Sequence, residues 1–341
     1  MAYTTIDDPS AYFHTQLYTG DGSSSNAITN NANAGNFQPD WLWTKCRSES
    51  RDHQMIDSSR GDNLGLRPNS NIAEYGASTE IDSNGFTMTD SSNTINGDGR
   101  TYVAWQWKAN GGTTTTNTDG DTNVTLQANA TAGFSIGTWN AGGSNAGAVG
   151  HGLGAAPEMV IVKRTDSTSN WHVWHQGLGD GNNYLLLNST GTKANDSYEY
   201  VSSIGSSTVS LAGGPGSNTE VAYFFRSIKG YSKLGTYEGN GNADGTFVYT
   251  GFQPEFIMIK NIDATFNWML FDNTRDEAVI NSLLEANTPD AERVDDKIDF
   301  VSNGFKLRST SGENNGSYTF IYMAFAKHPF VSSKGVPTTA R

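Results

Sequence analysis

The sequence predicts an all-β protein built from tandem antiparallel β-sandwich units. Three observations lead to this prediction: a composition rich in turn residues, a scarcity of helical apolar patterns, and a strand pattern that recurs three times. Gly accounts for 38 of the 341 residues, and Ser, Thr and Asn fill long stretches between short segments rich in aromatic residues. This mixture suits short strands that are joined by many turns.

Two sequence elements recur in the same order. The first is Pro, an acidic residue, four residues that favour β-structure, and Lys, at 39–45, 157–163 and 254–260. The second is an apolar segment at 103–107, 221–225 and 321–325, which follows each proline by about 65 residues. Two unrelated coincidences would hardly keep one separation three times, so we predict three copies of a unit of about 100 residues.

The second element should be a central strand. Val103, Trp105 and Trp107 alternate along it and share one face, and the other two copies repeat this alternation. Most of the intervening residues are apolar as well, so the strand should be covered on both sides. The Pro-headed segment is also expected to be a strand, because proline lacks a donor and is best placed at a strand's first residue.

The repeat sets the expected organisation of the chain. We predict units at 13–112, 132–229 and 230–330, and a flexible linker at 113–131, whose first half is polar and rich in Thr and Asn. Helical spacing is rare. A turn or two of helix is expected within 276–286, where Val279, Leu283 and Leu284 are spaced for one helical face.

An Asp-x-x-Arg pattern joins the first and third units. Asp57 and Arg60 correspond to Asp272 and Arg275, whereas the second unit has His175 near the place of the Asp. We interpret each pair as a local ion pair that fixes a turn. Such a pair contributes little to stability if it is exposed.

Charge and composition exclude several classes of function. The formal net charge is −13, the wrong sign for binding a phosphate backbone, so we expect neither nucleic acid nor an anionic membrane surface as a partner. No run approaches the roughly 18 apolar residues of a membrane span, and the first residues do not resemble a signal peptide. The single cysteine, Cys46, excludes a disulfide framework and a cysteine-rich zinc module.

Catalytic motifs are weak, and we expect no enzymatic activity and no cofactor. Glu80 and Asp82 lack the second Glu of a retaining-glycosidase pattern. Ser135 lies in a Gly-x-Ser-x-Gly string that is followed by a turn rather than by a helix, as a nucleophile elbow would require. No metal site is predicted, because His172 and His175 would face opposite sides of a strand and the acidic loop at 119–123 fails the EF-hand template.

A binding site is a further possibility. The segment 171–175 is expected to be a strand of the second unit whose tryptophans are core residues. Alternatively, an aromatic ring there could stack on a sugar face while nearby amides bind its hydroxyl groups. The candidate glycan-binding residues are Trp171, Trp174, Asn182 and Asn183.

The sequence resembles a group of phage proteins. The strings GHGLG at 150–154, GYSKLG at 230–235, TGFQP at 250–254 and PTTAR at 337–341 are similar to those of tandem-repeat virion proteins of tailed phages that infect marine bacteria. The resemblance covers nearly the whole chain. It implies concanavalin-like or jelly-roll β-sandwich units and a structural role in the virion, and it supplies no catalytic motif.

The polar ends suggest assembly contacts. The arms 1–12 and 331–341 are too polar to form cores of their own, so we expect them to dock against neighbouring subunits or other virion proteins, in a homo-oligomer that is expected to be a trimer. The residues assigned to these contacts are Tyr3, Ile6, Tyr12, Phe330, Val331 and Arg341.

The expected function is therefore that of a virion structural protein, in a tail fibre or tail appendage, whose stacked units could bind host-surface glycans with avidity. Three alternatives remain: a head decoration protein without a ligand, a glycan-degrading enzyme, and a cellular lectin-like surface module.

Overall fold

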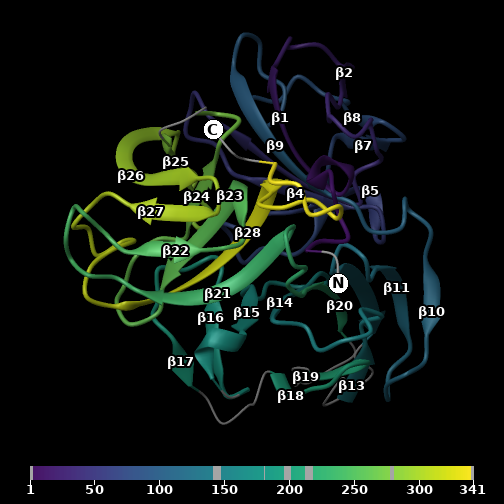
Figure 1. Cartoon of the computed structure of the whole chain (residues 1–341). Helices are drawn as coiled ribbons and strands as arrows, with labels where there is room; N and C mark the ends of the chain where they lie inside the picture. Colours follow the sequence, from purple (N-terminus) through teal and green to yellow (C-terminus); the bar gives the residue numbers. More distant parts are fainter. Residues whose placement is uncertain are drawn as a thin grey trace.

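The computed structural model describes residues 3–140, 147–179, 181–195, 201–211, 218–276 and 280–338, and within these ranges it contains β-strands, two short 3-10 helices and no α-helix (Figure 1). All strand pairs in the named strands are antiparallel. The all-β prediction is confirmed, and the antiparallel sheets are consistent with a β-sandwich architecture.

The first unit has a six-stranded sheet in the order β1-β9-β3-β4-β5-β6 and a small sheet in the order β2-β8-β7. It follows the 3-10 helix η1 (Pro9–Ala11). Its strands are β1 (Phe13–Thr19), β2 (Asn26–Thr29), β3 (Trp41–Cys46), β4 (Gln54–Asp57), β5 (Gly61–Leu66), β6 (Tyr75–Gly76), β7 (Thr79–Asp82), β8 (Gly85–Met88) and β9 (Thr101–Trp107).

The second unit has an eight-stranded sheet in the order β10-β11-β12-β20-β14-β15-β16-β17 and a small sheet in the order β13-β19-β18. Its elements are β10 (Thr115–Asn117), β11 (Val124–Asn129), β12 (Phe134–Asn140), β13 (Gly147–Gly150), β14 (Met159–Arg164), β15 (His172–His175), η2 (Gln176–Leu178), β16 (Asn183–Leu186), β17 (Ala194–Asn195), β18 (Val201–Ile204), β19 (Thr208–Leu211) and β20 (Thr219–Phe225).

In the third unit, one continuous sheet in the order β21-β28-β23-β24-β25-β26-β27-β22 forms both layers. Its strands are β21 (Ser232–Glu238), β22 (Phe247–Tyr249), β23 (Phe252–Asn261), β24 (Met269–Asp272), β25 (Ile280–Glu285), β26 (Arg293–Val301), β27 (Gly304–Leu307) and β28 (Thr319–Pro329).

The three units share one topology. In each, the opening strand pairs with the last strand, which pairs with the Pro-headed strand, followed by two more strands in chain order. The register is also shared, because Trp43 lies opposite Trp105, Ile161 opposite Tyr223, and Met258 opposite Met323. Positions that correspond in the sequence repeat therefore occupy equivalent places in the fold.

The units surround one common core. The face of the last strand that carries Val103, Trp105 and Trp107 in the first unit, and the equivalent faces in the other two units, contribute to a single buried cluster. Residues of the opposite faces, such as Ala104, Phe224 and Tyr322, belong to three separate clusters, each inside one unit. Both faces of these strands are thus covered, as the sequence predicts.

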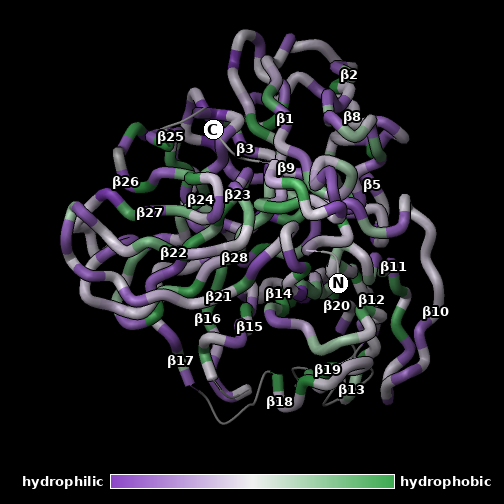
Figure 2. The backbone as a smooth tube through the Cα atoms, in the orientation of Figure 1, coloured by the Kyte–Doolittle hydropathy of each residue, from purple (hydrophilic) through white to green (hydrophobic). Residues whose placement is uncertain are grey.

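Figure 2 shows this arrangement by hydropathy: apolar segments lie along the strands, and polar segments along the outer loops. The sequence repeat predicts stacked units, but in the structure the three units do not form a row. Figure 1 shows the purple to blue, teal, and green to yellow parts of the chain grouped around the middle of the molecule. Because all three large sheets need cover for their apolar inner faces, a closed arrangement buries more surface than a row would.

Two predictions about local structure are wrong. The segment 113–131 is not a simple linker, since β10 and β11 pair with each other and β11 pairs with β12 of the second unit. The helix expected within 276–286 is a strand where it is described: residues 277–279 lie outside the described residues, and β25 follows. Leu283 and Leu284 point into different cores, so their helix-like spacing reflects a strand that is buried on both faces.

Candidate functional site

A buried ionic network lies where the third unit meets the first. At the end of β24, the Asp272 carboxylate accepts the backbone N–H of Arg275 at 2.9 Å and pairs with its guanidinium at 2.5 Å. Both side chains are fully buried. The expected local ion pair therefore exists, but it is buried. The small contribution to stability that an exposed pair would make does not apply to it.

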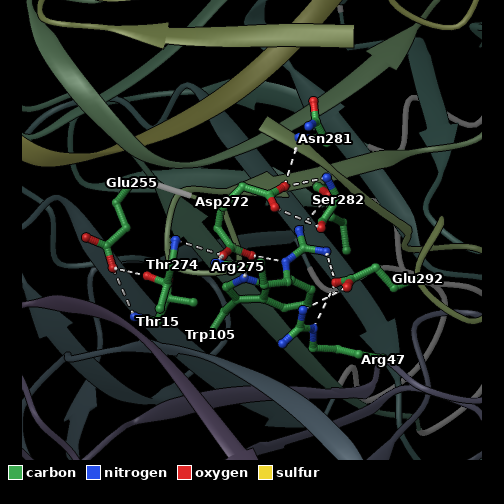
Figure 3. Close-up of polar contacts among 12 residues, drawn as sticks. Thr15, Arg47, Trp105, Glu255, Asp272, Thr274, Arg275, Asn281, Ser282 and Glu292 are labelled. Carbon is green, nitrogen blue, oxygen red and sulfur yellow. Dashed lines mark hydrogen bonds and ion pairs between the residues drawn. The ribbon is translucent and has the colours of Figure 1, made fainter. Parts of the chain in front are cut away.

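The network continues across the unit boundary (Figure 3). The indole N–H of Trp105 in β9 donates to Asp272 at 3.0 Å. Arg275 also donates to Glu292 at 2.9 Å, and Glu292 accepts two hydrogen bonds from Arg47 of the first unit at 2.9 and 2.8 Å. Burial alone would raise the pKa of Glu292, but the two guanidinium groups outweigh burial and lower it.

The first unit repeats this arrangement toward the second. Asp57 accepts the backbone N–H of Arg60 at 2.9 Å and pairs with its guanidinium at 2.6 Å. The hydroxyl of Tyr223 in β20 donates to Asp57 at 2.8 Å. Tyr223 occupies the position in the second unit that Trp105 occupies in the first. The same arrangement, a buried Asp–Arg pair and an aromatic donor from the neighbouring unit, therefore joins unit 3 to unit 1 and unit 1 to unit 2.

The second unit differs because its neighbour offers no donor. The equivalent position in the third unit is Met323, whose thioether cannot donate a hydrogen bond. Facing that unit, the second unit has His175 in place of the Asp and Leu178 in place of the Arg. Both are buried, and burial lowers the pKa of His175 to about 3, so the imidazole is neutral at pH 7. At this boundary, His175 and Leu178 therefore take the places of the Asp–Arg pair, and Met323 takes the place of the aromatic donor.

A second set of hydrogen bonds also crosses the boundaries between the units. Equivalent residues His53, Trp171 and Trp268 each direct a ring nitrogen at backbone carbonyl groups of another unit. Trp171 donates to Arg67 at 2.9 Å, and Trp268 donates to Leu186 at 2.9 Å. The Trp43 indole donates to Nδ1 of His53 at 2.9 Å, so Nε2 of His53 carries the proton that faces Glu285.

The acidic residues that follow the repeated prolines hold the junctions between units. Asp40 accepts the backbone N–H groups of Ala109, Gly111 and Gly112 at 2.7 to 2.8 Å, at the start of the connection to the second unit. Glu255 of the third unit accepts the backbone N–H of Thr15 in β1 at 3.2 Å. Burial raises the pKa of Glu255 to about 7. Through Glu255 the last unit contacts the first strand, which closes the ring.

The structure also contains a surface groove of about 670 Å³, where the second unit, the third unit and the N-terminal segment meet. Tyr3 donates its hydroxyl to the carbonyl of Gly251 at 2.8 Å and lies 3.1 Å from the hydroxyl of Tyr249. The side chain of Tyr249 is 48% exposed. The remaining lining residues are Glu158, Gln176, Ser227, Lys229, Ser232, Lys233, Leu234 and Thr250.

Two lysines lie against the two tyrosine rings of the groove. The ammonium of Lys229 lies 4.5 Å from the ring centre of Tyr3, and that of Lys233 lies 5.6 Å from the ring centre of Tyr249. Lys233 also donates to the carbonyl of Tyr249 at 2.8 Å. Glu158 accepts hydrogen bonds from Ser227 and from Gln176, so it is held at the wall of the groove.

The structure places the predicted glycan-binding tryptophans in the core. Trp171 is fully buried and bonds to the first unit, and Trp174 is 7% exposed within the core of the second unit. Neither ring has a free face on which a sugar could stack, so the stacking hypothesis for this segment is wrong. Asn183 donates to Leu178 at 3.0 Å, and Asn182 is half-buried on the preceding turn.

The arm residues contact the rest of the same chain. Ile6 is buried in the common core, and the ring of Tyr12 packs edge-on against Tyr231. Phe330 donates its backbone N–H to Gly251, and Val331 pairs with Pro337. Tyr3 lines the groove, and Arg341 lies outside the described residues. The contacts of Tyr3, Ile6, Tyr12 and Phe330 attach these segments to the sandwich units, whereas the bridge between Val331 and Pro337 lies within the C-terminal arm.

The weak catalytic and metal patterns have structural roles where they are described. Ser135 is buried in β12 and donates its hydroxyl to the carbonyl of His151 at 2.7 Å. Across the residues that the structure describes, no group of three or more His, Cys, Asp or Glu side chains could hold a metal ion. In that same part of the chain, no helix is long and apolar enough to cross a membrane.

The fold and its contacts define an all-β protein of three sandwich units locked in a ring around one core. Residues 8–329 match the model of a family described as a domain of unknown function, DUF7483, and the chain belongs to this family. The match spans all three units, so the family's domain is the complete ring. A comparison with curated proteins finds no match.

The groove is not among the predicted features. Lys229 directly precedes the string at 230–235, Lys233 lies within it, and Tyr249 directly precedes the string at 250–254. The position of these lysines and this tyrosine in or next to those strings could have indicated a site. The contact between Tyr3 and Tyr249 was not predictable, because it joins residues that are 246 positions apart.

Proposed function

We propose that this protein is a structural component of a phage virion, in a tail fibre or tail appendage, and that it acts by binding rather than by catalysis. The observation that carries the proposal is the locking of three sandwich units around one core by buried cross-unit contacts. A densely packed body of this kind holds its surface sites in a fixed geometry under load, which an appendage subunit requires. The resemblance to virion proteins supports the phage context.

Its partners would be other virion proteins and further copies of this chain. We keep a homotrimer as the expected assembly. Because the ring of three units is complete within one chain, such an oligomer would form through the outer surfaces and not through the common core. Light scattering of the purified chain measures the number of copies.

The test of the proposal is the position of the protein in intact particles. Gold-labelled antibody against the purified chain should decorate a tail appendage in electron micrographs, and pre-immune serum should not. Label over the shell would instead identify a head decoration protein. If the particles carry no label and contain no peptides of this chain by mass spectrometry, the virion proposal is wrong, and assays for glycan degradation become the next step.

A further inference from the structure

We propose that the groove between Tyr3 and Tyr249 is a binding site for a short acidic saccharide, that is, a chain of sugars that carry carboxylate groups. This inference deepens the proposed function and rests on it only for its biological meaning. The buried residues Trp171 and Trp174 do not line this groove, so it is a different candidate site from the one predicted at 171–175.

The first argument is the aromatic wall. Tyr249 is one of the few large apolar side chains of the described residues with substantial exposure. Its hydroxyl lies 3.1 Å from that of Tyr3, and the Lys233 ammonium lies against its ring, so these two contacts restrain the ring. A fixed ring with an exposed face can stack on the C–H face of a sugar, and its hydroxyl can exchange hydrogen bonds with the sugar's hydroxyl groups.

The second argument is the local charge. The whole chain carries a net charge of −13, whereas the charged residues that line the groove are two lysines and one glutamate. Lys229 is exposed and its ammonium lies against the Tyr3 ring, so its N–H groups can reach a ligand in the groove. An anionic ligand is therefore drawn to this groove and repelled by much of the surface.

The third argument is the way the groove is built. Its walls come from the N-terminal segment, the start of β14, η2, β21 and the turn after β22, which meet only when the second and third units have packed. Gln176 is held by Glu158 at 3.2 Å and by the carbonyl of Leu234 at 2.9 Å. The site is thus formed before a ligand arrives, which reduces the entropy lost on binding. Its volume of about 670 Å³ suits two or three sugar rings.

The experiment is isothermal titration calorimetry of the purified full chain with a tetrasaccharide of hexuronic acids, and with a neutral glucose tetrasaccharide as the matched ligand. We expect the acidic ligand to bind and to lose affinity as salt rises, and the neutral ligand to bind at least about tenfold more weakly. No binding of the acidic ligand, or equal binding of both ligands, overturns the proposal. The assay uses isolated protein, so its outcome is independent of where the protein lies in the particle.

Variants locate the site. Tyr249→Ala should weaken binding about tenfold, and Lys229→Gln with Lys233→Gln should weaken it by a similar factor and flatten the salt dependence. The controls are Phe247→Ala, an exposed ring on the same strand outside the groove, and Lys193→Gln, an exposed lysine of the second unit. Circular dichroism identifies any variant that fails to fold, and Tyr249→Leu then replaces Tyr249→Ala. Groove variants that fold and bind as well as the controls would contradict the site.

Discussion

At the scale of single residues, the repeated Asp position carries a buried carboxylate in the two units where the neighbouring unit supplies a donor. Asp272 faces the indole N–H of Trp105, and Asp57 faces the hydroxyl of Tyr223. His175 faces a unit that has Met323 at the equivalent place. Burying an ionised carboxylate without partners destabilises the folded state by several kcal/mol, so a neutral imidazole is compatible with this position and a carboxylate is not.

The first prediction concerns the pair at the boundary of units 3 and 1. Asp272→Asn leaves the buried Arg275 without its closest counter-charge, so we expect the free energy of unfolding to fall by about 3 kcal/mol in urea denaturation. Asp299→Asn is the control, because Asp299 forms a partly exposed pair with Arg308, and it should change stability by less than about 1 kcal/mol. Equal losses in the two variants would refute a special role for the buried pair.

The second prediction tests the replacement in the second unit. His175→Asp alone should cost about 3 kcal/mol, because the new carboxylate is buried without a guanidinium or a cross-unit donor. Adding Leu178→Arg and Met323→Tyr rebuilds the arrangement of Asp57, Arg60 and Tyr223, and it should recover much of the loss.

The readout for this second prediction is the coupling energy among the three changes, obtained from urea denaturation of the single and combined variants. The pair Leu178→Arg with Met323→Tyr, without the Asp, is the control and should remain destabilised. Purely additive losses would show that the three positions do not act together.

At the scale of elements, the Lys that ends each Pro-headed segment has the same environment three times. Lys45, Lys163 and Lys260 are buried, and each donates to the carbonyl of the next residue. Lys45 and Lys260 also reach carbonyl groups of another unit, at Pro289 and Thr190. Burial lowers the pKa of each to about 8.

The third prediction follows from these lysines. Between about pH 8 and the unfolded value of about 10.4, the unfolded chain binds more protons than the folded chain, so stability should rise with pH. Burial raises the pKa of Tyr223 and Tyr231 in the folded state. As pH passes the unfolded tyrosine value of about 10, the folded chain retains these protons, and stability should fall again. We therefore expect a stability maximum near pH 10.

Urea denaturation from about pH 7 to about pH 11 measures both the rise and the fall. Lys260→Met should reduce the slope of stability against pH, since it removes one of the three groups, whereas exposed Lys193→Met should leave the slope unchanged. A Lys260→Met slope equal to that of the parent chain would contradict the assignment.

At the scale of the whole molecule, the three units pack against one another in a ring and share one core. Aromatic residues of all three units contact one another in the common core: Trp41 stacks on Tyr223 with ring centres 4.5 Å apart, and Phe13 stacks on Phe325 at 5.0 Å. Removing any one unit would expose the inner faces of the other two.

The fourth prediction is that the chain unfolds in one cooperative step. Scanning calorimetry should give a single transition whose calorimetric and van't Hoff enthalpies agree. A chain that ends at residue 229 lacks one side of the core and should not give a folded species by near-ultraviolet circular dichroism. Two or three resolved transitions, or a folded truncated chain, would show that the units are independent.

Several features were predictable because they are periodic along the chain. The alternation of Val103, Trp105 and Trp107, and the proline at the head of each paired segment, specify strands and their faces from local stereochemistry. A local pattern also led to one wrong prediction, the helix within 276–286. The neighbouring Leu283 and Leu284 looked helical because spacing alone does not distinguish a helix from a strand that is buried on both faces.

The repeat, the all-β class and the apolar strand faces could be predicted from the sequence, since each of these depends on residues near one another in the chain. The three-dimensional structure was needed to show that the three inner faces meet in one core, that Trp171 is buried against the first unit, and that Tyr3 lies beside Tyr249. Apolar periodicity states that a face must be covered, but any apolar face satisfies that requirement. The partner is selected by packing and directional hydrogen bonds between residues that are distant in the chain.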